Sequence, residues 1–246
     1  MKVLKVVTLP DLHNPYNIDI TPILDYLDDE RFDVVQYLGD TTNAESCNHW
    51  KEAKNYPKDI ESVAEDYANL VTDILEPIRK SMPKKHKCVF HIGNHEDWFY
   101  QTMLADSKAT HKYGIEDNID TKKYNMEIIG LNEHKQFGHL FFTHGIYIND
   151  HHAKKMAMHY RKNIRYGHAH DIQSFMLQSP IDKSERVIAQ SIGCLCNLNM
   201  VYMRQRPHRW VNSFNVAYIR SDGTFNDYTV VITDGKFTAP NGRQYK

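Results

Sequence analysis

The sequence has few cysteines and lacks the cysteine patterns of zinc knuckles and redox pairs. Its four cysteines, Cys47, Cys88, Cys194 and Cys196, include no C-x-x-C pair. The last two are too close in sequence for a standard zinc half-site. We therefore interpret all four as reduced and mainly structural, a usage that favours an intracellular protein.

Long apolar runs and an excess of charge are also absent. No stretch is long enough to span a bilayer, and the amino-terminal segment lacks the apolar core and cleavage site of a signal peptide. The formal net charge is −1, which excludes a global attraction to nucleic acid or membrane and leaves only local basic patches. We expect a cytoplasmic protein with no membrane partner, and we leave a homo-oligomer open.

Histidine is the residue in excess, with 15 copies in 246 residues. Imidazole is the commonest metal ligand in proteins, so the positions of these histidines are informative. The chain is long enough for one sizeable core, and we expect a single domain over residues 1–246. A helical insert is expected at about 43–86, and a polar tail at about 236–246 is expected to be loosely ordered.

Apolar runs alternate with helix-favouring stretches in the first part of the chain. Runs at 3–8, 33–38 and 89–92 read as buried strands, with helices expected at 18–27 and within the insert. This β-α-β-α-β order is typical of a parallel α/β sheet. A helix is predicted at 150–161. Further strands are predicted at 124–131, 136–143, 164–166, 173–177, 186–191, 214–220 and 225–233.

Five apolar runs end in a cluster of Gly, His, Asp or Asn. The clusters are Asp11-x-His13, Gly39-Asp40, Gly93-Asn94-His95-Glu96, His144-Gly145 and Gly167-His168-x-His170. Each alone could be an ordinary turn, but ligands in open α/β sheets bind beyond the carboxyl ends of strands. Side chains at alternate positions of an extended chain point the same way, so each x-spaced pair could hold one metal together.

With His95 and Glu96 set aside, these clusters offer two carboxylates, one amide oxygen and four imidazoles, which is too many ligands for one metal and about right for two. The candidates are Asp11, His13, Asp40, Asn94, His144, His168 and His170. Mixed nitrogen and oxygen ligands without thiolate suit borderline ions, with manganese expected first and Fe, Zn, Ni or Co as alternatives. Two such ions clamp the attacking and leaving oxygens of an in-line displacement at phosphorus.

The order D-x-H, G-D, G-N-H-E, H-G, G-H-x-H resembles the calcineurin-like metallophosphoesterase superfamily, in the branch of Mre11/SbcD-like nucleases and small phosphodiesterases. The resemblance covers residues 11–170. It implies a four-layer α/β/β/α sandwich with a dimetal site at the carboxyl ends of the strands. The protein-phosphatase branch of this superfamily carries an arginine in G-D-x-x-D-R-G, whereas Thr41-Thr42-Asn43 follows Asp40 here.

The resemblance also implies a role for each residue of the motifs. One metal would be held by Asp11, His13, Asp40 and His170, and the other by Asp40, Asn94, His144 and His168. His95 would be the general acid that protonates the leaving oxygen after attack by a metal-bridging hydroxide. Glu96 is assigned to the catalytic group as a residue that could orient His95, with a helix-start or supporting carboxylate as the alternative.

Two stretches of cations beside aromatic rings, 159–166 and 202–210, suit a nucleic-acid backbone and its bases. We name five arginines as candidate substrate contacts: Arg161, Arg165, Arg204, Arg206 and Arg209. The favoured function is therefore a phosphodiesterase or nuclease acting on nucleic acid or nucleotides. A phosphomonoesterase is the alternative, and a non-catalytic metal-binding scaffold is a third.

Overall fold

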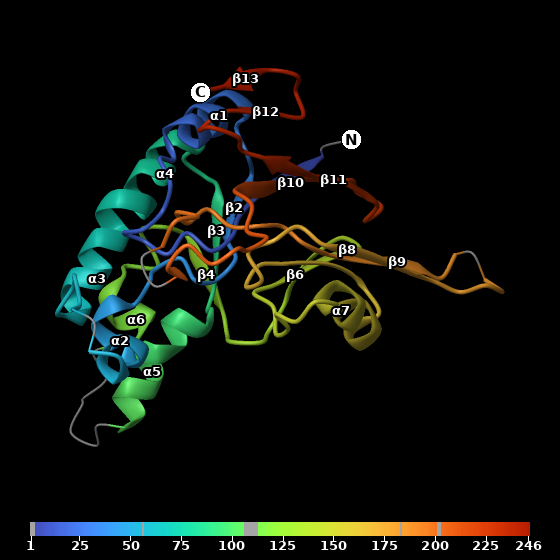
Figure 1. Cartoon of the computed structure of the whole chain (residues 1–246). Helices are drawn as coiled ribbons and strands as arrows, with labels where there is room; N and C mark the ends of the chain where they lie inside the picture. The colour runs from blue at the N-terminus through green and yellow to red at the C-terminus, as the bar shows by residue number, and fades with distance from the viewer. Residues whose placement is uncertain (1–2, 56, 106–112, 183, 201–202) are drawn as a thin grey trace.

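Two β-sheets lie face to face in the structure, a computed structural model that describes residues 3–55, 57–105, 113–182, 184–200 and 203–246 (Figure 1). The first sheet has the strand order β11-β10-β1-β2-β3-β4, and the second has the order β5-β6-β7-β9-β8. The first sheet contains β1 (Leu4–Leu9), β2 (Val34–Tyr37), β3 (Lys87–His91), β4 (Met126–Ile129), β10 (Ser213–Ile219) and β11 (Phe225–Val231). The second contains β5 (Lys135–Phe137), β6 (Leu140–Thr143), β7 (Asn163–Tyr166), β8 (Ser174–Gln178) and β9 (Arg186–Ser191).

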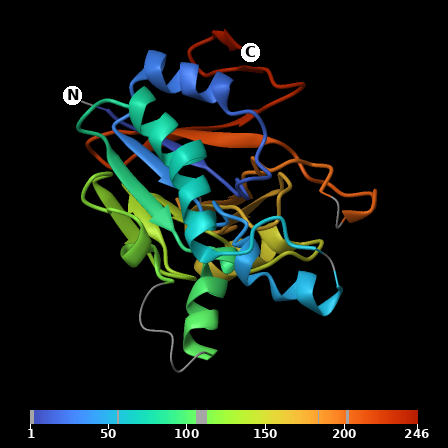
Figure 2. The same cartoon turned by 90° about the vertical axis from the view of Figure 1, so that its left-hand side faces the viewer.

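Helices cover the outer faces of both sheets, which gives the predicted α/β/β/α order (Figures 1 and 2). The helices on the first sheet are α1 (Thr21–Glu30), α3 (Val63–Asn69) and α4 (Glu76–Ser81), and α7 (His152–Tyr160) covers the second. Three buried apolar clusters fill the interfaces between layers. Tyr26 belongs to the cluster under α1, Phe142 to the one between the sheets, and Met156 to the one under α7. The predicted fold class is confirmed.

The parallel core of each sheet determines where the motifs meet. Strands β1, β2, β3 and β4 are parallel neighbours in the first sheet, and β6, β7 and β9 are parallel neighbours in the second. The carboxyl ends of parallel strands lie at one edge of a sheet, where loops carry the functional residues of α/β proteins. The loops after β1, β2, β3, β6 and β7 therefore reach the same edge of the sandwich.

The insert between β2 and β3 is helical, as the sequence predicts. It contains η1 (Glu45–Cys47), α2 (His49–Ala53), α3, η2 (Leu70–Leu75) and α4. A π-helical segment, η2, joins α3 to α4, and the Glu76 N–H bonds to the Val71 carbonyl oxygen. Pro77 follows directly and has no N–H to donate, so a wider turn before it avoids part of the cost of a proline inside a helix.

The carboxyl-terminal tail is not loosely ordered, contrary to the expectation from its composition. Strands β12 (Phe237–Thr238) and β13 (Gln244–Tyr245) form an antiparallel pair. The rings of Phe237 and Tyr245 stack with centroids 5.3 Å apart, and both contact Tyr26 of α1. The two aromatic residues bury enough apolar surface to fix a polar segment that has little structural preference of its own.

A second correction concerns residues 136–143, which form two strands and not one. A hairpin reverses the chain at Gly138 and pairs β5 with β6. Gly138 has a φ of +56°, and a Cβ atom there would lie 2.5 Å from the Gly223 carbonyl oxygen, so only glycine fits.

The remaining helices are α5 (Asn94–Ala105) and α6 (Ile115–Asn118). Among the described residues, no helix is both long and apolar enough to cross a membrane.

Candidate metal centre

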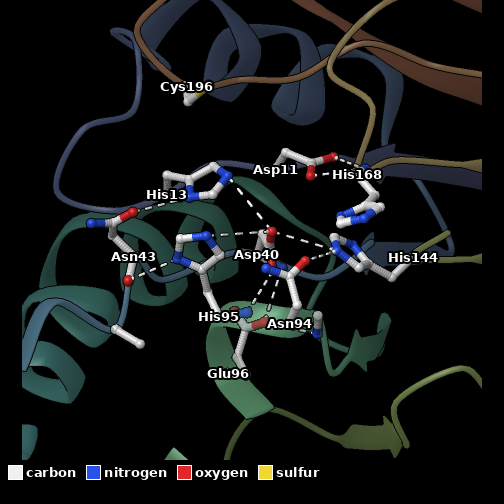
Figure 3. Close-up of polar contacts among 12 residues, drawn as sticks. Asp11, His13, Asp40, Asn43, Asn94, His95, Glu96, His144, His168 and Cys196 are labelled. Carbon is white, nitrogen blue, oxygen red and sulfur yellow. Dashed lines mark hydrogen bonds and ion pairs between the residues drawn. The ribbon is translucent and has the colours of Figure 1, made fainter. Parts of the chain in front are cut away.

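Six of the seven predicted ligands are labelled in Figure 3 around one point at the edge where the strands end, and the seventh, His170, lies beside Asp11 and His13. Asp40, which follows β2, is at the centre of this group. Its Oδ2 atom is 3.8 Å from His13 Nε2, after β1, and 3.4 Å from His144 Nε2, after β6. Two residues remote in sequence are thus directed at one buried carboxylate.

The ligand atoms form two groups on either side of Asp40. In the first, His170 Nε2 is 3.2 Å from Asp11 Oδ1 and 3.2 Å from His13 Nε2. In the second, His144 and His168 join Asp40 with ligand atoms within 4.8 Å of one another. The Asn94 side-chain oxygen belongs to this second group, 3.1 Å from His144 Nε2.

The chemistry of these donors fits a pair of cations. Asp11 and Asp40 are buried carboxylates, and the groups that face them are imidazoles. The His13 and His170 Nε2 atoms point at each other across 3.2 Å, an arrangement in which at most one nitrogen can donate a hydrogen to the other. A divalent ion between them would accept both lone pairs, and this oxygen and nitrogen donor set suits Mn, Fe or Zn.

The other ring nitrogens are held so that Nε2 faces the centre. His144 Nδ1 lies 2.9 Å from the Leu38 carbonyl oxygen, and His13 Nδ1 lies 3.1 Å from the Asn43 side-chain oxygen. A carbonyl oxygen only accepts, so Nδ1 carries a hydrogen, and Nε2 is the nitrogen that can bind a metal once the ring is neutral. Asn43 was missed from the sequence because it belongs to no motif. Behind His170, Cys196 Sγ lies 3.8 Å from Nδ1, on the side away from the centre.

The backbone at the ligand positions is left-handed and not extended. Positive φ values occur at five of the seven positions: Asp11 (44°), His13 (51°), Asp40 (48°), His168 (65°) and His170 (60°). The premise that x-spaced pairs point the same way because the chain is extended is therefore wrong. Strained residues of this kind cluster at functional sites.

Two motif glycines are required because the carboxylates pack directly on them. A Cβ atom at Gly93 would lie 2.2 Å from Asp40 Oδ1, and one at Gly167 would lie 2.2 Å from Asp11 Oδ2. Any side chain at either position would displace a predicted ligand.

The charges of the centre influence each other. Burial opposes ionisation of Asp40, but His144 and His95 outweigh it and hold the pKa of Asp40 well below its usual value. Burial would lower the pKa of His144, yet Asp40 outweighs this effect and raises the pKa of His144 to about 9. Burial, aided by His144, lowers the pKa of His168 to about 4. His168 is thus ready to bind a metal, whereas His144 must first release a proton.

Two facing sheets and five strand-end motifs around a shared aspartate define the architecture. This is the α/β/β/α sandwich that the resemblance to the calcineurin-like metallophosphoesterases implies.

No family model matches this sequence, and no curated protein is similar to it. Similar solved structures include Vps29 from Entamoeba histolytica in complex with Zn²⁺, at 13% identity and a TM-score of 0.46, covering 95% of this chain and 96% of that one. Vps29 from Cryptosporidium parvum has 13% identity and a TM-score of 0.48, covering 96% and 94%. A predicted phosphoesterase from Streptococcus pneumoniae has 13% identity and a TM-score of 0.37, covering 100% and 94%.

Glu96 holds the backbone of the loop after β2 and does not orient His95. Its Oε2 atom accepts hydrogen bonds from the amides of Gly93 and Asp40, and its Oε1 atom accepts them from Thr41 and Thr42, at 2.7–3.0 Å. The side chain is fully buried, so a substrate does not reach it. The assignment of Glu96 to the catalytic group is therefore corrected to a positioning role.

His95 lies at the rim of the centre and is partly exposed. Its Nδ1 atom donates to the Asn43 carbonyl oxygen over 2.9 Å, and its Nε2 atom is 3.9 Å from Asp40 Oδ2. The ring faces Trp98 of α5 with centroids 4.0 Å apart. His95 could also join a metal group with His13 and Asp40, so the general-acid role remains a prediction.

The five candidate arginines are at different places. Arg165 is buried and forms a bidentate pair with Asp227 of β11, with Nε–Oδ2 at 2.5 Å and Nη2–Oδ1 at 2.7 Å. It links the two sheets, so its assignment to substrate binding is wrong. Arg161 is the C-cap residue of α7, at the opposite end of β7 from His168, and substrate contact by Arg161 remains a prediction. The sequence pattern did not reveal the structural role of Arg165, because its partner lies 62 residues away.

The other three arginines lie in the 203–210 segment; Tyr202 is outside the described residues. Arg204 and Arg206 line a cleft beside His95. Arg209 is exposed and pairs with Asp150. Substrate contact by these residues remains a prediction.

Proposed function

We propose that this chain is a dimetal-dependent phosphoester hydrolase that prefers phosphodiesters of nucleic acids or nucleotides. The observation that carries the proposal is Asp40, shared between two groups of buried ligand atoms, with His95 beside it. When bound, two divalent cations would polarise the phosphoryl oxygens and lower the pKa of coordinated water. We expect manganese first, with Fe, Zn, Ni or Co as alternatives.

The residues of the chain position the reacting groups. Asp11, His13 and His170 would hold one cation, Asn94, His144 and His168 the other, and Asp40 both. The Asn43 carbonyl oxygen fixes the His95 ring with Nε2 toward the centre. A protonated His95 would donate from Nε2 to the leaving oxygen, which stabilises the developing charge as the bond to phosphorus breaks.

Two observations favour diesters over monoesters. A cleft of about 910 Å³ adjoins His95 and gives room for a second substituent on the phosphate. Ala44 is buried at the position where the G-D-x-x-D-R-G of the protein-phosphatase branch has its arginine. The phosphomonoesterase remains the alternative, and a scaffold without turnover remains the third hypothesis.

The test is hydrolysis of bis-p-nitrophenyl phosphate and p-nitrophenyl phosphate by protein loaded with each metal in turn. We expect metal-dependent turnover with the diester preferred. Replacing Asp40 with alanine should abolish turnover and the binding of both metals, and replacing the exposed His134 with alanine is the matched control. Preference for the monoester would favour the alternative. No turnover of either ester with any metal would favour the scaffold.

A further inference from the structure

The cleft beside His95 lies between two segments that are distant in sequence. The helical insert supplies one wall, with Trp50 and Lys54, and residues from 197–200 and 203–206 supply the other, with Met203 and Arg206. Asn94, His95 and Trp98 form the floor. Of the predicted metal ligands, Asn94 alone is among the described lining residues, so the cleft opens on the general-acid side of the centre.

Aromatic rings lead from His95 to the mouth of this cleft. Trp98, 8% exposed, lies against the His95 ring. The His49 ring is 5.4 Å from Trp98 and 5.0 Å from Trp50, centroid to centroid. Trp50 on α2 is 57% exposed, so a large face of its ring is accessible at the mouth of the cleft.

The lining is basic although the chain as a whole is nearly neutral. Four of its charged residues are positive, Lys51, Lys54, Arg204 and Arg206, and one, Asp59, is negative. Lys51 pairs with Glu45 and Asp59 inside the insert, whereas Lys54 lies 5.9 Å from the Trp50 ring centroid. A site that binds single-stranded nucleic acid needs an aromatic ring on which a base stacks and a cation that binds the next phosphate. The exposed Trp50 ring and the nearby cations provide both.

We propose that this cleft is the leaving-group subsite and binds an unpaired nucleoside, with its base on Trp50. The inference rests on the proposed hydrolase function and names its substrate class as single-stranded oligonucleotides or dinucleotides. Bases in a duplex are paired and stacked, so their faces are not available to Trp50. A cleft of about 910 Å³ is the size of a small-ligand pocket.

The position of His95 gives the cleft its role in the reaction. Water adds to phosphorus, the bond from phosphorus to the nucleoside oxygen breaks, and the electron pair of that bond stays on the leaving oxygen. The proton of His95 goes to this oxygen, and the proton released by the attacking water restores His95. Because His95 lines the cleft while its Nε2 atom faces the centre, the leaving oxygen that receives the proton lies at the inner end of the cleft, and its nucleoside extends into the cleft.

The kinetic test compares the dinucleotide dApdA with glycerophosphocholine, a diester without a ring, on the metal-loaded full chain. Trp50→Ala should lower the ratio of their kcat/KM values by about 5- to 140-fold, the range for stacking of one base on an aromatic side chain. Trp50→Phe should restore most of the ratio. Tyr228→Ala removes a comparably exposed ring from β11 and should leave the ratio unchanged.

A binding test separates this inference from the proposed hydrolase function. In the metal-free protein, dApdA should quench tryptophan fluorescence, inorganic phosphate should not, and Trp50→Ala should weaken the dApdA titration by a similar factor. An unchanged ratio in Trp50→Ala, faster cleavage of glycerophosphocholine than of dApdA, or no quenching would overturn the inference. In each case metal-dependent hydrolysis of bis-p-nitrophenyl phosphate would still support the hydrolase. Failure of that hydrolysis with intact quenching would reject the hydrolase and retain the nucleoside site.

Discussion

Glu96 gives the sharpest test of how the centre is held, because its carboxylate accepts four backbone hydrogen bonds without touching the predicted general acid. Glu96→Gln keeps the shape but replaces one oxygen with an NH₂ group, so two of the four amides face a donor. An unsatisfied buried donor costs roughly 1–3 kcal/mol. We therefore expect the free energy of unfolding to fall by about 2–6 kcal/mol.

The assay is denaturant unfolding of the metal-free protein, followed by calorimetric metal titration. Metal affinity should fall as well, because two of the bonded amides belong to Asp40 and Thr41, and a shift in this loop moves the shared ligand. Asp97→Asn, in the same turn of α5, is the control and should change stability by no more than about 0.5 kcal/mol. Equal stability and equal metal binding in Glu96→Gln and wild type would refute the reasoning.

Three further predictions test other parts of the structure. His95→Ala should keep metal binding by calorimetry and lower kcat by about 10²–10⁴-fold, the range for general acid catalysis; loss of metal would instead make His95 a ligand. Arg165→Ala should lower the unfolding free energy by about 3–5 kcal/mol, because it removes the cation from an Asp227 carboxylate that is 9% exposed and keeps a hydrogen bond from Asn215; a loss of turnover without a loss of stability would restore Arg165 to the substrate site. Burial, aided by His144, lowers the pKa of His91 from 6.5 to about 3. Between pH 3 and 6.5 the unfolded chain therefore binds one more proton than the folded chain. The free energy of unfolding should fall by about 1.4 kcal/mol for each pH unit below 6.5. Denaturant unfolding at several pH values should show this slope, and His91→Gln should reduce it by that amount.

The sequence predicted the sheets and the meeting of the motifs because both depend on local signals. Short apolar runs ended by glycine predict strands and their carboxyl ends, and parallel pairing then brings those ends together. Residues 186–191 were predicted as a strand and form β9 over the same range. The tail was misjudged because its order depends on Tyr26, a contact across more than 200 residues that no window of sequence contains.

The supporting residues of the centre could not be predicted for the same reason. Asn43 bonds His13 through its side chain and His95 through its backbone, and neither contact has a spacing that a motif would reveal. Arg165 stands in a basic-aromatic stretch that is typical of substrate contacts. Its side chain instead points between the sheets, because a strand alternates its faces and position 165 is on the inner one.

The backbone conformation at the ligand positions could not be predicted from the motifs. It explains why aspartate and histidine occupy the five positions with positive φ. Five left-handed non-glycine residues cost about 5–10 kcal/mol, which is comparable with the net stability of a domain. Bonds between loops offset this cost: the His13 amide donates to the Asp40 carbonyl oxygen, the His168 amide to the Asp11 carboxylate, and the Val211 amide to the His170 carbonyl oxygen. Glycine would adopt the same φ values without strain, so packing alone gives no reason for aspartate and histidine there. Their side chains supply the ligand atoms, and the left-handed turn aims each of them at the shared centre, so the strain has its physical explanation in the metals that these atoms would bind.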